Sequence, residues 1–182
     1  MQNPKKLSVL LIGCLKVIIV LLFTYYLYNC IKTPDDFHYI QGVDLILHEA
    51  GHIIFIFFGR FVNILGGSLN QVLIPFIFSA YFFLRKEIYS GSIVLMWIGE
   101  SITNVAIYAK DAIIMQLPLL GGDSVIHDWN YLLSTLNILK YTDIIGGIIY
   151  YLGISVIVIG AILALYSSFR TKDDIPRQYA TM

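Results

Sequence analysis

The sequence predicts an all-α, polytopic membrane protein that forms a single integral membrane domain over residues 1–182. Hydrophobic residues make up 58% of the 182-residue chain and charged residues only 13%, which is far more apolar than a soluble domain of this size. The apolar residues also gather in runs of about 20, the length that crosses a ~30 Å hydrocarbon core as a helix. We therefore expect about five membrane segments. They are residues 7–28, 43–58, 61–84, 88–109 and 146–169.

Three of these segments have the length and composition of simple spans. Residues 7–28 contain one charged residue, Lys16, whereas residues 61–84 and 146–169 contain none. Each run is long enough to cross the bilayer once. Because no small-residue cleavage site follows the first run, we expect a retained helix there rather than a signal peptide.

The other two segments carry polar residues at membrane depth. Residues 43–58 are too few for a full span, so this segment could be tilted or re-entrant. Residues 88–109 contain a polar stripe that continues just beyond them and falls on one side of a helix. Such a stripe faces protein rather than lipid, where it either shapes a site or joins helices. It consists of Glu100, Asn104, Tyr108 and Asp111.

The charge of the chain excludes one class of partner. Twelve basic and 12 acidic residues give a net charge of zero, and the basic residues are dispersed. A nucleic-acid binder would instead concentrate positive charge on one face. The same dispersal leaves the orientation open, because five basic residues would fall on one side of the membrane and six on the other.

The pentapeptide His48-Glu49-Ala50-Gly51-His52 lies inside the short second segment. Two histidines four residues apart project from one side of a helix and can share a zinc ion, and Glu49 can reach a water bound to that ion. Burying two imidazoles and a carboxylate in an apolar segment costs several kcal/mol unless a metal or hydrogen bonds satisfy them. We therefore expect His48 and His52 to bind Zn²⁺, the alternative being that they pair with polar groups on neighbouring helices.

Zinc needs a third protein ligand, and the sequence offers two candidates. His127 lies in the polar loop that follows Gly121-Gly122, and Asp111 ends the polar stripe. We favour His127 and keep Asp111 as the alternative. Asp128 fits best as the N-cap of a helix beginning near Trp129.

Further residues could support the ligands. Asp44 lies one helical turn before His48 and could accept a hydrogen bond from a ligand imidazole, or simply sit at the helix start. Gly66-Gly67 would permit close helix approach, and Asn70 or Gln71 could bond a ligand histidine or join helices.

A zincin pentapeptide on an apolar helix, in a compact chain of several spans, resembles the site-2-protease-like membrane zinc metallopeptidases. The chain is also similar to a small family of bacterial membrane proteins without an established activity, which share the stretches HEAGHIIFIFFG, LGGSLNQVLIPFIF, and LPLLGG followed by HDWNYLL. The first resemblance implies zinc ligation by His48 and His52, with Glu49 as the catalytic general base. The Asn-Pro and Leu-Asp-Gly pattern that supplies the third ligand in that family is absent here. The second resemblance implies a bacterial cytoplasmic membrane.

These observations predict a zinc-dependent metallopeptidase, a hydrolase that cuts a peptide bond in a membrane or membrane-proximal substrate. Its expected partners are a membrane protein or peptide substrate and the lipid bilayer, with no nucleic acid. Two alternatives remain open. One is a non-catalytic metal-binding membrane scaffold or regulator, and the other is an ion or proton carrier, suggested by Lys16, Glu100 and Asp111 within or beside apolar runs.

Overall fold

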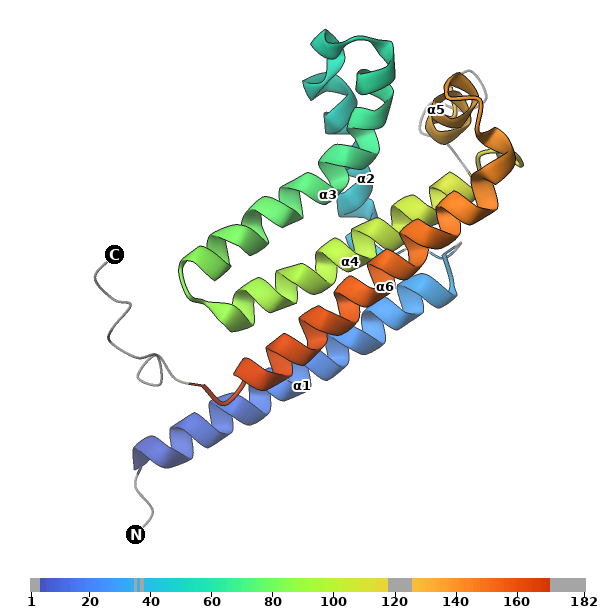
Figure 1. The fold of residues 1–182 in the computed structure, drawn as a ribbon. Coiled ribbons are helices and arrows are strands. Elements are labelled where there is room, and N and C mark those ends of the chain that lie inside the picture. The colour runs from blue at the N-terminus through green and yellow to red at the C-terminus, as the bar shows by residue number, and fades with distance from the viewer. Residues whose placement is uncertain (1–3, 35, 37, 118–125, 171–182) are drawn as a thin grey trace.

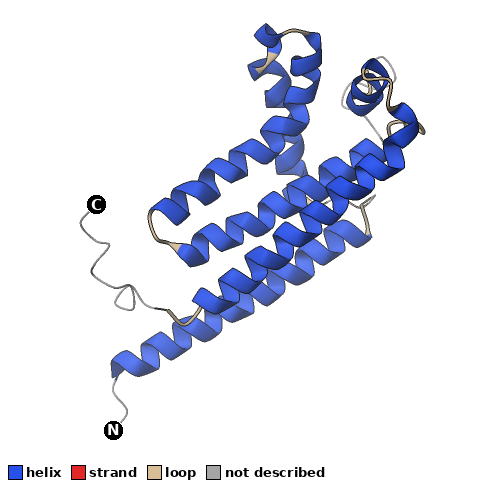
Figure 2. Ribbon diagram, viewed as in Figure 1, coloured by secondary structure: helices blue, strands red, loops and turns tan. Residues whose placement is uncertain are grey.

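The protein is described by a computed structural model that covers residues 4–34, 36, 38–117 and 126–170. Every regular element in these ranges is a helix (Figure 2). This confirms the all-α prediction. The six α-helices are α1 (Pro4–Lys32), α2 (Tyr39–Ile54), α3 (Arg60–Leu84), α4 (Ile88–Lys110), α5 (Asp128–Thr135) and α6 (Thr142–Ser167).

Four helical stretches in the described ranges are long and apolar enough to cross a membrane. They correspond to four of the five predicted segments, as expected for an integral membrane protein. The last one starts earlier than predicted, because the short 3-10 turn Leu139–Tyr141 leads directly into α6. The four stretches are Leu7–Lys32, Arg60–Leu84, Ile88–Lys110 and Leu139–Ser167.

The second of the five expected membrane segments is not among these four. Helix α2 has 16 residues, or roughly 24 Å at ~1.5 Å per residue, which is less than the hydrocarbon core. It is followed by η1 (Ile56–Phe58), and the chain then turns at Gly59. Gly59 has φ 82°, a conformation that favours glycine, so the apolar sequence before it cannot continue as one long helix.

Helices α4 and α6 run side by side through the centre of the molecule, and α1 lies along α6 (Figure 1). The close packing of α4 against α6 depends on glycines spaced seven residues apart on α6. A Cβ atom at Gly153 would lie 2.7 Å from the carbonyl oxygen of Gly99 and 2.6 Å from Thr103 Cγ2. Small residues of this kind let two membrane helices approach backbone to backbone. The three glycines with this spacing are Gly146, Gly153 and Gly160.

Helices α2 and α3 meet in the same way, because a Cβ atom at Gly51 would collide with the backbone of Gly66. The expected close approach at Gly66-Gly67 is therefore present. Helix α5 docks on this pair, since Trp129 Nε1 donates to Ser68 Oγ at 3.1 Å. These contacts bring α2, α3 and α5 together beside the C-terminal end of α4.

Candidate metal centre

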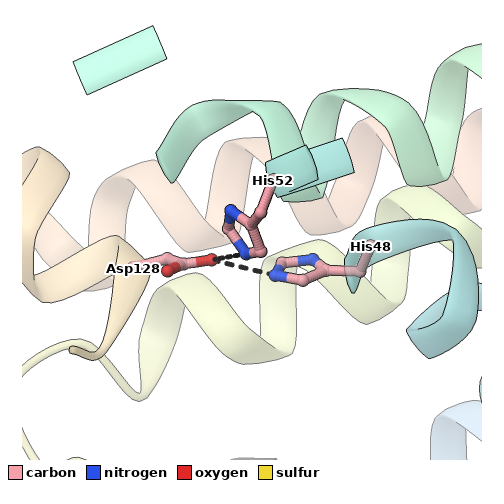
Figure 3. A group of neighbouring side chains, drawn as sticks. All are labelled: His48, His52 and Asp128. Atoms are coloured by element: carbon pink, nitrogen blue, oxygen red, sulfur yellow. Dashed lines mark hydrogen bonds and ion pairs between the residues drawn. The ribbon is translucent and has the colours of Figure 1, made fainter. Parts of the chain in front are cut away.

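Three side chains from two distant parts of the chain converge beside the end of α4. His48 and His52 come from α2 and Asp128 from α5, and the three point toward one another (Figure 3). Their potential ligand atoms all lie within 4.8 Å of one another. Asp128 Oδ2 is 2.9 Å from His48 Nε2 and 3.2 Å from His52 Nε2. Within the described ranges, they are the one group of three such side chains that could hold a metal ion.

Local structure explains why each side chain reaches this point. His48 and His52 occupy the same face of α2 because residues four apart are stacked on a helix. Asp128 is the first residue of α5. Its backbone N–H donates to Tyr108 Oη at 3.1 Å, which ties the start of α5 to α4.

Hydrogen-bond partners outside the group of three orient the imidazoles of His48 and His52. His48 Nδ1 lies 3.4 Å from Gln71 Oε1, and His52 Nδ1 lies 3.0 Å from the carbonyl oxygen of Asn63. Each of these oxygens is an acceptor, so each Nδ1 keeps its proton, and each Nε2, which faces Asp128, can bind a metal ion in place of a proton. Gln71 is itself held, because its Nε2 donates to Asn104 Oδ1 at 2.8 Å. The expectation that Asn70 or Gln71 could bond a ligand histidine is therefore met by Gln71.

The group is buried on one side and open on the other. The side chains of His48 and Asp128 are each 9% exposed, whereas that of His52 is 25% exposed. Glu49 is exposed, and its carboxylate is close enough to His52 to act on it electrostatically. His52 is therefore the most exposed member of the group.

The pKa values reflect the contact between the imidazoles and the carboxylate. The hydrogen bond to Asp128 raises the pKa of His52 to about 8, against the opposing effect of burial. Burial raises the pKa of Asp128, but hydrogen bonds to His48 and His52 outweigh it and hold this pKa below its ordinary value. Asp128 is therefore a carboxylate at neutral pH, and a metal ion that binds His52 would displace a proton.

The donor set fits a divalent metal ion. Two imidazole nitrogens and one carboxylate oxygen are the ligands found in catalytic zinc sites, which keep a fourth position for water or substrate. The backbone around His48 leaves the necessary space, because a Cβ atom at Gly67 would come within 2.5 Å of His48 Nε2. A residue with a side chain at position 67 would occupy the place of the ligand atom.

The structure does not bring the two predicted third ligands to the histidines. His127 Nε2 pairs with Asp111 Oδ2 at 3.2 Å, and His127 Nδ1 accepts the backbone N–H of Asn130 at 3.3 Å. Both ring nitrogens of His127 are thus engaged elsewhere. The N-cap of α5 is His127 rather than Asp128, so the predicted cap position is corrected by one residue. Asp128 is thereby free to face α2.

The supporting residues were only partly anticipated. Asp44 accepts from Trp97 Nε1 at 2.8 Å and from Ser101 Oγ at 3.0 Å, and no bond to a ligand imidazole is among its described contacts. The stripe on α4 does face protein, and Asn104 and Tyr108 support the group through Gln71 and Asp128. Asn63 was missed, because a backbone acceptor leaves no signal in the sequence.

Fold and site together define an all-helical protein with four candidate membrane-spanning helices and a buried His-His-Asp group that could bind metal. Comparison of the chain with protein-family models, curated proteins and solved structures finds no match.

Proposed function

We propose that this protein is a membrane zinc metallopeptidase in which His48, His52 and Asp128 bind the zinc ion and Glu49 is the general base. The observation that carries the proposal is that the ligand atoms of the two histidines of His-Glu-x-x-His on α2 and of Asp128 on α5 all lie within 4.8 Å of one another. Three protein ligands leave one position open, which distinguishes a catalytic zinc site from a closed structural one. An aspartate as third ligand also agrees with the resemblance to site-2-protease-like metallopeptidases.

The chemistry is amide hydrolysis. A zinc ion held by His48, His52 and Asp128 would supply Lewis-acid chemistry, because it would polarise a carbonyl group and lower the pKa of a bound water to about 7. Glu49, exposed next to His48, takes the proton of the attacking water and delivers it to the leaving amine. Asp128 and the partners of the two Nδ1 atoms keep the imidazoles in place during this transfer.

The position of the group favours a substrate at one face of the membrane. Tyr108, which supports Asp128, is two residues from the end of α4, and α2 is too short to span and is a candidate re-entrant helix. A helical segment cannot offer its carbonyl groups, because they are already hydrogen-bonded. The substrate is therefore a membrane-proximal or locally unwound segment of a membrane protein or peptide.

Substituting Glu49 tests the proposal, because Glu49→Gln removes the base and keeps the ligands. The wild-type protein and the variants Glu49→Gln and His48→Ala are purified in detergent, and their zinc content is measured by plasma mass spectrometry. Cleavage of fluorogenic membrane-anchored peptides is then followed in proteoliposomes. We expect about one zinc per chain and turnover in the wild type, zinc without turnover in Glu49→Gln, and neither in His48→Ala. Zinc binding with cleavage unchanged in Glu49→Gln would contradict the role of Glu49. A folded wild type that takes up no zinc would exclude the metallopeptidase and favour a role of these side chains in helix packing or transport.

A further inference from the structure

Two carboxyl side chains meet in the interior of the helix bundle, apart from the metal centre. Asp44 on α2 has an exposed fraction of 0% and Glu100 on α4 of 1%. The two carboxyl groups are in hydrogen-bonding contact. Glu100 lies near the middle of the 23-residue α4, which is a candidate membrane span.

Basic residues do not neutralise this pair. Among the described residues, the ion pairs of the metal centre and of His127 with Asp111 involve neither Asp44 nor Glu100. The titratable groups that act on Glu100 from other elements are Tyr26 and Cys30 on α1 and Asp44 itself, and none of them is basic. Two buried carboxylates in contact repel each other strongly, so one of them is neutral.

The hydrogen bonds identify which of the two is ionised. Both oxygens of Asp44 accept donors, Oδ1 from Trp97 Nε1 at 2.8 Å and Oδ2 from Ser101 Oγ at 3.0 Å. This is the environment of a carboxylate, which is an acceptor only. Glu100 Oε2, in contrast, is a buried oxygen without a hydrogen-bond partner. A negative charge on a carboxyl group with a bare buried oxygen would be costly, so Glu100 is the neutral member.

A proton fits this pair better than a metal ion. Two carboxyl oxygens at hydrogen-bonding distance share a proton, whereas a bound metal ion would stand between them and require further ligands. The described residues place three metal-ligating side chains together only at His48, His52 and Asp128.

We infer that Asp44 and Glu100 form a proton-binding site near the middle of α4, in which Glu100 carries the proton and donates it to ionised Asp44. The site is separate from the metal centre and does not depend on the proposed peptidase activity. It also joins α2 to α4, because Trp97 and Ser101 reach α2 through the same carboxylate. Loss of the proton would place two negative charges in contact and separate the two helices.

Infrared spectroscopy tests this site directly, because a protonated carboxyl group has a C=O stretching band distinct from that of a carboxylate. Zinc-loaded protein in lipid nanodiscs at pH 7 is compared with Glu100→Gln, Asp44→Asn and, as a control at an exposed carboxylate, Glu49→Gln. We expect the protonated band in the wild type and in Glu49→Gln. It should be lost in Glu100→Gln and kept at a shifted frequency in Asp44→Asn, where Glu100 still holds the proton but donates it to a weaker acceptor.

Each other result overturns part of the inference. Absence of the band in folded wild type would mean that no carboxyl group holds a proton, and its persistence in Glu100→Gln would place the proton elsewhere. If Glu100→Gln does not fold, Asp44→Asn decides, because loss of the band there would make Asp44 the carrier. In a final comparison, the infrared band is recorded with sodium in place of choline as the buffer cation, at constant ionic strength. A band that disappears with sodium would show that the pair binds a metal cation instead. Zinc content should be the same in all four proteins.

Discussion

Gly67 of α3 lies directly against the imidazole of His48. A Cβ atom at position 67 would be 2.5 Å from His48 Nε2, closer than such atoms approach in folded proteins. This nitrogen is the one that faces Asp128 Oδ2 at 2.9 Å. The absence of a side chain at Gly67 therefore leaves the space for His48 Nε2, the atom that we propose binds the metal ion.

Replacing Gly67 by alanine should weaken zinc binding without unfolding the protein. The added methyl group forces the ring of His48 away, while Gln71 holds its other nitrogen. We expect a loss of zinc affinity of at least about 10-fold, the range seen when ligands lose their orientation. The substitution should not destabilise helix α3, because alanine is favoured over glycine in helices by about 1 kcal/mol. A zinc titration against a competing chelator measures the loss.

Gly147→Ala is the matched control for this substitution. Gly147 lies in α6, and a Cβ atom there would meet nothing within 4 Å. The Gly147→Ala variant should bind zinc with the same affinity as the wild type. Equal zinc affinity in Gly67→Ala and Gly147→Ala would contradict the placement of His48 against Gly67.

Asp128 and His127 should differ sharply in their effect on metal content, although they are adjacent in sequence. Asp128→Ala removes an oxygen that lies within 3.2 Å of both histidine Nε2 atoms, so zinc should be lost. His127→Ala breaks a pair with Asp111 outside the group and should leave most of the zinc in place. Plasma mass spectrometry on both purified variants measures this difference. The opposite pattern, zinc kept in Asp128→Ala and lost in His127→Ala, would restore His127 as the ligand.

The sequence could predict two members of the candidate metal centre but not the third. His48 and His52 meet because they are four residues apart on one helix, a relationship that is local and readable from spacing. Asp128 is 80 residues from His48, and its position depends on how α5 docks on α3 through Trp129 and Ser68. Both His127 and Asp128 are polar residues at a helix start, so the sequence alone did not separate the cap from the residue that faces α2.

The limits of the fold prediction have a similar cause. Runs of apolar residues identified the four long helices, because length and hydropathy are properties of each segment by itself. The end of the short second segment was harder to predict, since its apolar residues continue to Phe58 whereas α2 ends at Ile54. The turn at Gly59 and the packing of Gly51 on Gly66 set its geometry, and both involve backbone conformation rather than hydrophobicity.

Zinc affinity should rise with pH up to about 8. The pKa of His52 is raised to about 8 by its bond to Asp128, so below that pH His52 holds a proton that zinc must displace. Above it, this competition ends and the affinity should level off. An ordinary histidine would reach its plateau near pH 6.5. Chelator competition between pH 6 and 9 gives the profile, and calorimetry in buffers of different ionisation enthalpy counts the released protons. An affinity already constant between about pH 7 and 8 would contradict the raised pKa.

Gly153→Ala should destabilise the helix bundle while leaving the metal centre intact. The new methyl group would lie 2.7 Å from the carbonyl oxygen of Gly99, a backbone atom that cannot move without separating α4 from α6. Overpacking of this kind costs about 1–3 kcal/mol, so the thermal unfolding temperature in detergent should fall. Gly147→Ala, on the same helix but in open space, should unfold at or above the wild-type temperature, because only the helix propensity changes there. Equal unfolding temperatures for the two variants would mean that α4 and α6 do not pack glycine against glycine. Zinc content at low temperature should remain that of the wild type in both, since α6 contributes none of the three ligands.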